Sequence, residues 1–282
     1  MALPQEFDLR KFVESVLAED LGAGGDVTSK ATIAADARFT AEMRGRQHFV
    51  VAGLEIAEAF FKALDQNVRT ESLTSDGAQV EAGAVLMRLD GNARAMLAAE
   101  RSALNTLQHL SGIATMARRY VDEIDGTGAA LLDTRKTLPG LRILEKYASR
   151  MGGAQNHRMR LDDGVLIKDN HVAVCGDVAE AVRRAKASNS GLEVHVEVDR
   201  IEQIEPALAA GADRLLLDNM DPAMLRQAVA LVAGRVPLEA SGGVTLETIR
   251  FIAETGVNFI SVGRITQSAP AVDIGLDYSI VG

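Results

Sequence analysis

Residues 213–243 read DRLLLDNMDPAMLRQAVALVAGRVPLEASGG, and this stretch contains the pattern that decides the fold. The apolar run at 215–217 predicts a buried strand, and the amphipathic segment 221–234 predicts a helix. A second short apolar run at 237–238 leads into the polar sequence EASGG. A strand, a helix and a further strand joined by short turns are typical of a parallel βαβ unit.

The same alternation continues through the chain after residue 128. Helical stretches separate six short apolar runs, which read AALLDTRK, GVLIKDNH, LEVHVEVD, DRLLLDN, VPLEASGG and NFISVGR. A weaker strand is expected near residues 153–157. The repeat predicts a (β/α) barrel, with an open doubly wound sheet as the alternative.

The first part of the chain follows a different pattern. Its periodicity predicts helices at 7–21, 53–65 and 94–125, and alternating apolar residues predict a strand at 38–52. Residues 68–91 have the short strands and glycine turns of a lipoyl-type hairpin, but the lysine that such domains modify is absent from the tip. We therefore interpret this region as purely structural.

Composition excludes several classes of protein. The 282 residues include 30 Lys and Arg against 39 Asp and Glu, so the formal net charge is 30 − 39 = −9. An acidic chain is a poor general binder of nucleic acid, and no apolar run approaches the length of a membrane span. The N-terminus lacks the layout of a signal peptide, and Cys175 is the single cysteine. We expect a cytoplasmic protein.

Polar and charged residues follow nearly every predicted strand. In a parallel barrel these strand ends meet at one mouth, where such folds place their active sites. Residues 131–170 contain eight bases and five acids, an excess of +3 within an acidic chain. Arg142 and Lys146 are expected to be solvated helix charges. The candidates for binding carboxylates or phosphates are therefore Arg135, Lys136, Arg158 and Lys168.

Later strands bring a different chemistry. Glu197 and Asp218 follow two of them, and carboxylates suit Mg²⁺ or sugar hydroxyls. The sequences SGG at 241–243 and VGR at 262–264 end the last two strands, where glycine lets backbone N–H groups approach a phosphate. The mouth is therefore predicted to have a basic half, an acidic half and a phosphate-binding edge.

Taken together, these motifs resemble the quinolinate phosphoribosyltransferase family, and the resemblance covers almost the whole chain. The matching segments in the second part are DTRKTLPGLR (133–142), GGAQNHRMRLDDGVLIKDNH (152–171), VEVD (196–199), LLLDNM (215–220), EASGGV (239–244) and SVGRIT (261–266). Those in the first part are EDLGAGGDVTS (19–29) and ERSALNTLQHLSGIAT (100–115).

The resemblance implies an α/β fold with two domains. Residues 1–112 would form an α/β sandwich and residues 113–267 a (β/α) barrel of the type II phosphoribosyltransferase kind, with the tail 268–282 packing back on the first domain. It also implies a pentosyltransferase of de novo NAD biosynthesis. The enzyme would convert quinolinate and phosphoribosyl pyrophosphate into nicotinate mononucleotide, CO₂ and pyrophosphate, with Mg²⁺.

The resemblance also assigns roles to residues. Arg101 would reach the quinolinate pocket from the partner subunit of a homodimer, and Lys136, Glu197 and Asp218 would be catalytic. Glu197 and Asp218 would bind the ribose and the metal, the metal either directly or through water. The full set of implied substrate-binding residues is Arg101, Thr134, Arg135, Lys136, His157, Arg158, Lys168, Glu197, Asp218, Ser241, Gly242, Gly243, Val262, Gly263 and Arg264.

Some residues and alternatives lie outside this assignment. The family usually has a histidine where this chain has Gln267, which excludes an ionic phosphate contact there. His48, His109 and His195 are expected to be structural, and His171 to bond locally. The alternatives are a Schiff-base aldolase using Lys168, a relative associated with molybdenum transport, and a non-catalytic anion-binding protein.

Overall fold

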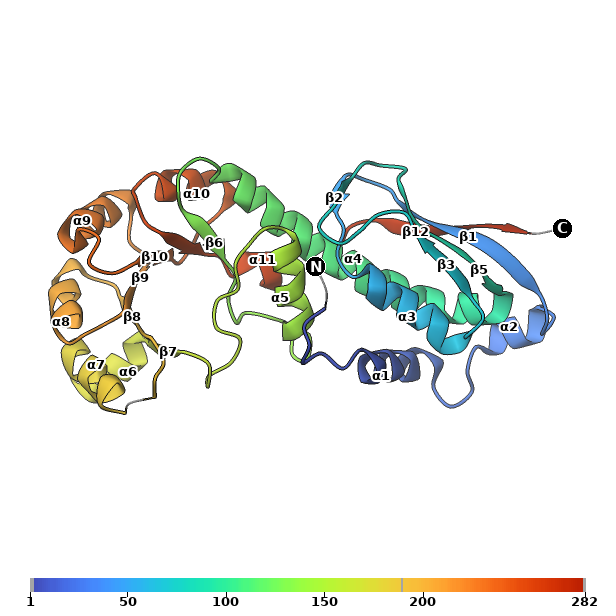
Figure 1. The fold of residues 1–282 in the computed structure, drawn as a ribbon, viewed down its shortest axis with the longest axis horizontal. Coiled ribbons are helices and arrows are strands. Elements are labelled where there is room, and N and C mark those ends of the chain that lie inside the picture. The colour runs from blue at the N-terminus through green and yellow to red at the C-terminus, as the bar shows by residue number, and fades with distance from the viewer. Residues whose placement is uncertain (1–2, 189, 281–282) are drawn as a thin grey trace. The chain divides into compact units, whose positions relative to one another are not determined.

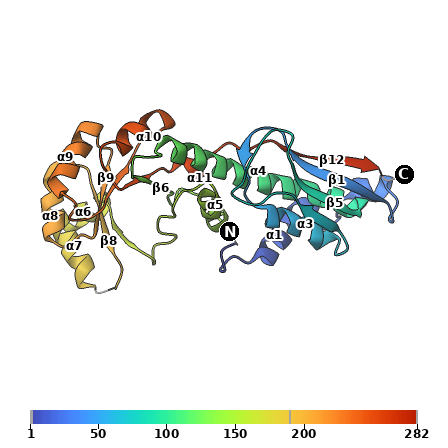
Figure 2. The same cartoon turned by 45° about the horizontal axis from the view of Figure 1, so that its top comes forward.

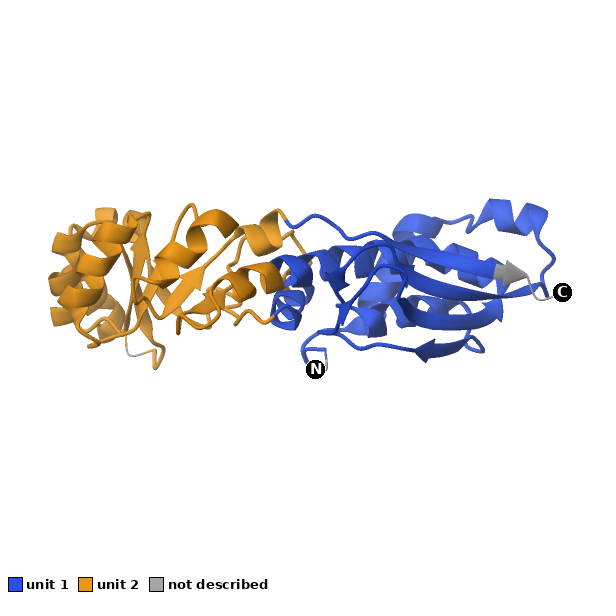
Figure 3. Cartoon of the chain, turned by 90° about the horizontal axis from the view of Figure 1, so that it is seen from above, with its two compact units in different colours: residues 1–116, 143–152, 269–282 blue, residues 117–142, 153–268 orange. Residues whose placement is uncertain are grey.

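The computed structural model describes residues 3–188 and 190–280, which divide into two compact units. Unit 1 comprises residues 1–116, 143–152 and 269–282, and unit 2 comprises residues 117–142 and 153–268 (Figure 3). The two units are not continuous in sequence, because residues 143–152 belong to unit 1 although they lie between two stretches of unit 2.

Unit 1 is built on an antiparallel sheet with the strand order β12-β1-β5-β3 (Figure 1). Its strands are β1 (Arg38–Gly45), β3 (Arg69–Ser72), β5 (Val85–Asn92) and β12 (Ile274–Ile280), and a separate pair is formed by β2 (Phe49–Val50) and β4 (Gln79–Val80). Its helices are α1 (Leu9–Leu21), α2 (Val27–Thr32), α3 (Leu54–Leu64) and α5 (Arg142–Met151), and α4 (Ala93–Glu123) begins here and ends in unit 2.

The strand expected at 38–52 is confirmed over β1, where Phe39, Ala41 and Met43 are buried and the residues between them are not. It ends at Gly45, and Phe49–Val50 form the separate strand β2, which pairs with β4. The side chains of Phe60, Phe61 and Leu107 belong to the same apolar cluster, so α3 and α4 contribute to one core with the sheet. The predicted helices at 7–21, 53–65 and 94–125 correspond to α1, α3 and α4.

The helix α5 differs from the sequence expectation. Lys146 was predicted to be a solvated charge, but it is completely buried, as is its neighbour Glu145. The apolar residues Leu144 and Tyr147 belong to the core cluster of unit 1. The Tyr147 hydroxyl donates a hydrogen bond of 2.6 Å to Asp76, and burial is the main reason why its pKa is well above the ordinary range.

Within the described residues, unit 2 contains a six-stranded parallel sheet with the order β6-β11-β10-β9-β8-β7. The strands are β6 (Ala130–Leu132), β7 (Val165–Ile167), β8 (Val194–Val198), β9 (Arg214–Asp218), β10 (Leu238–Ser241) and β11 (Phe259–Ser261). Each of the six predicted runs forms one of them.

The strand order favours a barrel-like sheet over the doubly wound alternative. From β7 to β11 the strands lie side by side in chain order, and β6, the first strand, pairs with β11, the last. A doubly wound sheet would instead reverse its strand order at a switch point. The weak strand expected near 153–157 is present as a parallel bridge between Gln155 and Leu132.

Helices cover the outside of this sheet (Figures 1 and 2). They are α6 (Asp169–Cys175), α7 (Val178–Ala187), the 3₁₀ helix Ile201–Gln203, α8 (Ile204–Ala209), α9 (Pro222–Val232), α10 (Leu246–Ala253) and α11 (Arg264–Gln267). In the described part of the chain, no helix combines the length and the apolar character that crossing a bilayer requires.

Candidate active site

The main cavity of unit 2 lies at the carboxyl ends of its parallel strands and has a volume of about 890 Å³. All the predicted site residues of this unit line it: Thr134, Arg135, Lys136, His157, Arg158, Lys168, Glu197, Asp218, Ser241, Gly242, Gly243, Val262, Gly263 and Arg264. The strand register explains this convergence, because Asp218, Ser241 and Ser261 are the last residues of adjacent strands β9, β10 and β11.

Arg101 is the one predicted site residue outside this cavity. It is exposed on α4, within unit 1. The cavity lining includes further residues that were not among the predicted site residues, namely Leu166, Leu216, Asn219, Glu239, Val244, Thr245, Ser261 and Gln267.

The basic side of the cavity contains two guanidinium groups close enough to repel each other. Burial, and then the positive charge of Arg135, lower the pKa of Arg158. Arg158 donates a hydrogen bond of 3.0 Å to the Gly164 carbonyl, whereas the buried Nε of Arg135 has no partner among the described residues. A bound anion would offset the repulsion between the two guanidinium groups.

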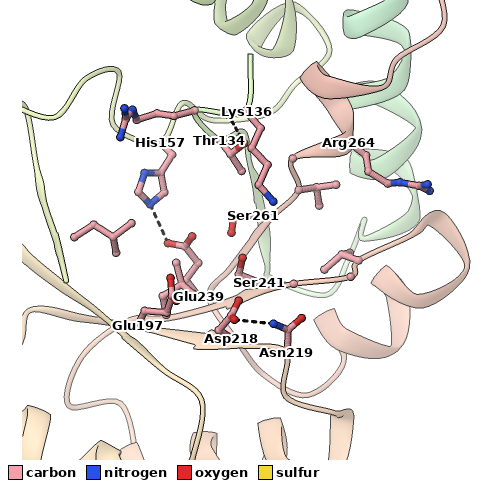
Figure 4. A pocket seen from close by; sticks show the side chains of 18 of the residues that line it. Thr134, Lys136, His157, Glu197, Asp218, Asn219, Glu239, Ser241, Ser261 and Arg264 are labelled. Atoms are coloured by element: carbon pink, nitrogen blue, oxygen red, sulfur yellow. Dashed lines mark hydrogen bonds and ion pairs between the residues drawn. The ribbon is translucent and has the colours of Figure 1, made fainter. Parts of the chain in front are cut away.

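Lys136 and the loop after β6 are held by local hydrogen bonds. The Lys136 backbone N–H donates to the Thr134 hydroxyl at 3.0 Å, and the Thr266 hydroxyl donates to the Lys136 carbonyl at 2.7 Å. Figure 4 shows the Lys136 side chain extending toward Ser261 and Ser241. The loop thereby aims an ammonium group across the end of the sheet.

The acidic side is formed by Glu197 on β8 and Asp218 on β9. Glu197 is 13% exposed and lies 3.2 Å from the Lys168 ammonium. Asp218 accepts a hydrogen bond of 2.7 Å from the Asn219 side chain, yet burial raises its pKa above the ordinary value. Two partly buried carboxylates on neighbouring strands therefore face the cationic half of the cavity.

These carboxylates fit a magnesium ion that is shared with a substrate. Among the described residues, no three Asp, Glu, His or Cys side chains form a cluster that would hold a metal alone. Mg²⁺ is commonly bound by one or two protein carboxylates, with substrate phosphates and waters as its other ligands. Glu197 and Asp218 supply this kind of donor set.

The turns after β10 and β11 both contain glycine, but they differ in which backbone N–H groups a phosphate could use. Gly242 has φ +94° and Gly243 has φ +62°, a conformation that favours glycine. In the second turn, the Val262 N–H already donates to the Leu132 carbonyl at 3.0 Å, so a phosphate contact through that N–H would break a sheet hydrogen bond. Gln267 is exposed and lines the cavity.

The other histidines have local partners. His109 Nε2 lies 2.9 Å from buried Glu145, and His195 Nε2 lies 3.0 Å from Glu193. His171 Nδ1 accepts a hydrogen bond of 2.9 Å from the Lys168 backbone, which confirms the predicted local bond.

Comparison with known proteins identifies the family to which this chain belongs. Family models described as the N-terminal and C-terminal domains of quinolinate phosphoribosyl transferase match residues 26–111 and 113–277. The chain belongs to the quinolinate phosphoribosyl transferase family. Residues 143–152, which belong to unit 1, lie within the stretch that matches the C-terminal domain of the family.

Similar proteins from bacteria match over nearly the full length. The chain is 42% identical to the probable nicotinate-nucleotide pyrophosphorylase (carboxylating) of Bacillus subtilis, covering 96% of this chain and 94% of that protein. It is 43% identical to the nicotinate-nucleotide pyrophosphorylase (carboxylating) of Mycobacterium leprae, covering 96% and 98%. The solved structure of the nicotinate-nucleotide pyrophosphorylase from Francisella tularensis matches with a TM-score of 0.92 at 41% identity, covering 96% of each chain.

Proposed function

We infer that this member of the quinolinate phosphoribosyl transferase family transfers phosphoribosyl from phosphoribosyl pyrophosphate to quinolinate with loss of CO₂. The products are nicotinate mononucleotide and pyrophosphate. The observation that carries this inference is the division of one cavity into a basic half, an acidic half and two glycine-containing turns. Such a cavity suits a dicarboxylate beside a phosphorylated sugar.

The basic half is assigned to quinolinate. Arg135, Arg158 and Lys168 would hold its two carboxylates, and Thr134 and His157 would line the same subsite. The closeness of the two guanidinium groups supports this assignment, since burial and the charge of Arg135 lower the pKa of Arg158, and a bound dianion would offset that repulsion. Fixed cations also orient the pyridine nitrogen for attack without reorganising solvent.

The other half is assigned to phosphoribosyl pyrophosphate. Ser241, Gly242, Gly243, Gly263 and Arg264 would contact phosphate, while Glu197 and Asp218 would bind the ribose side. Val262 would line the subsite without donating to phosphate, because its N–H is bonded to the Leu132 carbonyl. The two carboxylates would also hold Mg²⁺, directly or through water. The ion would supply positive charge next to the pyrophosphate.

The chemistry requires no protein nucleophile. Pyrophosphate leaves ribose C1 with the electrons of the C–O bond, and Lys136 supplies positive charge near the departing group. The pyridine nitrogen then forms the bond to C1 with its lone pair. The resulting pyridinium ring accepts the electrons of the breaking bond to the 2-carboxylate, CO₂ departs, and the ring carbon takes up a proton.

The aldolase alternative fits the site less well. A lysine that forms a Schiff base is usually activated by burial in an apolar pocket or beside another cation. The side chain of Lys168 is 49% exposed and lies beside the carboxylate of Glu197. This environment suits anion binding better than imine formation.

The assembly and the location are further parts of the proposal. We place the enzyme in the cytoplasm as a homodimer, with Arg101 of each subunit completing the quinolinate subsite of its partner. The exposure of Arg101 on α4 is compatible with this role, and a chain with one cysteine forms no intramolecular disulfide.

A mixture of two inactive variants tests the shared site. Arg101→Ala and Lys136→Ala are each expected to be inactive as homodimers. If the two residues meet across a symmetric interface, subunit exchange restores about a quarter of the wild-type sites. Initial rates before and after exchange measure this recovery. No recovery after exchange, verified by native mass spectrometry, would contradict the shared site.

A glycine substitution tests the turn after β10. A Cβ added at Gly242 would lie 2.1 Å from Asn219 Oδ1 and 3.0 Å from the Asn219 backbone nitrogen. Because the turn must shift, we expect Gly242→Ala to raise the KM for phosphoribosyl pyrophosphate by about 10-fold. Gly234→Ala is the matched control, since Gly234 has φ +76° with nothing within 4 Å. Equal kinetic effects in both variants would exclude a specific role for this turn.

Calorimetric binding compares the two pyridine acids that the site must distinguish. Quinolinate has two carboxylates and nicotinate has one, so quinolinate is expected to bind more tightly to the substrate-free enzyme. Tighter binding of nicotinate would argue against the proposed function.

A further inference from the structure

Glu239 is a buried carboxylate at the floor of the cavity to which the proposed chemistry gives no role. It lies on β10 and is 1% exposed. Its Oε2 is 3.4 Å from His157 Nε2 and 3.5 Å from the nearest guanidinium nitrogen of Arg214 (Figure 4 shows the His157 contact). Removing a charge from water without strong compensation is costly, so such a group requires an explanation.

The partners of Glu239 keep it ionised. Although burial opposes ionisation, His157, Ser261 and Arg214 together hold the pKa of Glu239 below its ordinary value. Arg214 is itself held in place, because its guanidinium lies 4.2 Å from the centre of the Phe259 ring. Glu239 therefore presents a fixed negative charge to the Nε2 edge of His157.

The other ring nitrogen of His157 determines the tautomer. His157 Nδ1 accepts a hydrogen bond of 2.9 Å from the backbone N–H of Arg158, so Nδ1 carries no proton in this arrangement. In the neutral ring the proton is then on Nε2, which is the nitrogen that faces Glu239. The His157 backbone N–H donates to buried Asp133 at 2.9 Å, which fixes the start of the same segment.

We propose that Glu239 is a positioning residue that holds His157 in the Nε2–H tautomer, so that Nδ1 can orient the backbone of Arg158. The chain of contacts runs from Glu239 to His157 and then to Arg158, whose guanidinium lines the cavity. Its last step, the placement of a group that binds quinolinate, rests on the proposed function. The tautomer itself does not.

Nitrogen-15 NMR of the histidine rings, without substrate, tests the first part. The His157 signals are assigned by their loss in His157→Asn, and the wild type is expected to show a protonated Nε2 and an unprotonated Nδ1. In Glu239→Gln the neutral amide can present either its oxygen or its NH₂ group to Nε2, so a tautomer mixture is expected. A wild-type proton on Nδ1, or signals unchanged in Glu239→Gln, would overturn the proposal.

Steady-state kinetics test the second part. Glu239→Gln is expected to raise the KM for quinolinate by about 10-fold, while the KM for phosphoribosyl pyrophosphate changes by less than about twofold. Glu193→Gln is the matched control, because it removes the partner of a neighbouring histidine, His195, outside the cavity lining. Equal changes in both KM values, or no change, would overturn the positioning role.

A second variant keeps the test valid if Glu239→Gln does not fold. Glu239→Asp keeps the negative charge but withdraws it by one methylene from both His157 and Arg214, and it is expected to give the same selective rise in the KM for quinolinate. Because the NMR measurement uses no substrate, an enzyme inactive with quinolinate would refute the proposed function, and the tautomer would still be decided separately.

Discussion

Arg158→Ala is expected to lower kcat/KM for quinolinate by about 100-fold or more. The guanidinium is partly buried, and its pKa is lowered by burial and by the charge of Arg135. Its positive charge is therefore unfavourable in the empty cavity, and a bound anion would offset this. Removing one partner of a buried pair of opposite charges, here the guanidinium and a carboxylate of quinolinate, typically costs about 2–5 kcal/mol. Each 1.4 kcal/mol corresponds to about a factor of ten in kcat/KM.

Initial rates over a range of quinolinate concentrations measure this loss, with phosphoribosyl pyrophosphate saturating. Arg160→Ala is the matched control, because Arg160 is two residues away, is 61% exposed and pairs with Asp162 outside the cavity lining. The control should retain nearly wild-type kinetics, since exposed ion pairs contribute little. A similar loss in both variants would show that the segment, and not the Arg158 charge, is responsible.

Asp218→Asn is expected to lower kcat/KM for phosphoribosyl pyrophosphate by about 100- to 1000-fold, because the proposed function assigns this carboxylate to the ribose and the metal, where its charge would act on the transition state. The substitution keeps the size of the side chain at the end of β9 and removes one of the two carboxylates that face the cationic half. The apparent affinity for Mg²⁺ should weaken in the same variant. Rates measured across Mg²⁺ concentrations separate these two effects.

Asp221→Asn provides the control for this variant. Asp221 caps the start of α9 by accepting hydrogen bonds from the N–H groups of Ala223 and Met224 at 2.8 and 2.9 Å. Asparagine caps helices about as well, so this variant should fold and react like the wild type. If Asp218→Asn shows the same kinetics as Asp221→Asn, the metal and ribose role of Asp218 is wrong.

The pH dependence of Asp218 has a defined sign. Because burial raises its pKa, the carboxyl takes up a proton at a higher pH than an exposed aspartate does. Under the proposed function the ionised form would bind Mg²⁺, so kcat/KM for phosphoribosyl pyrophosphate should fall on the acid side as the pH drops through this pKa. The residual activity of Asp218→Asn should lack this component, and an unchanged acid limb would contradict the assignment.

The sequence was sufficient to predict the parallel sheet and the residues at its mouth. An apolar run followed by polar residues identifies both a strand and its carboxyl end, which is why the runs ending at Asp218 and Ser241 located the cavity. The β1 alternation was equally readable, because one face of that strand is buried.

The remaining features depend on contacts between distant segments. Lys146 lies on a helix with ordinary polar spacing, and only the packing of α5 in unit 1 buries it. Glu239 lies on β10, next to the strand end that the sequence predicts, but its position beside His157 depends on the pairing of β10 with β9 and β11. The short strand β4 pairs with β2, a choice that no local pattern indicates.

The most direct test of the central claim follows the fate of a single carbon. Quinolinate labelled with carbon-13 in its 2-carboxylate is mixed with the enzyme, phosphoribosyl pyrophosphate and Mg²⁺, and the products are observed by NMR. The account predicts labelled CO₂ and unlabelled nicotinate mononucleotide in equal amounts, with one pyrophosphate for each. Product formed from nicotinate but not from quinolinate, or nucleotide that retains the label, would contradict it.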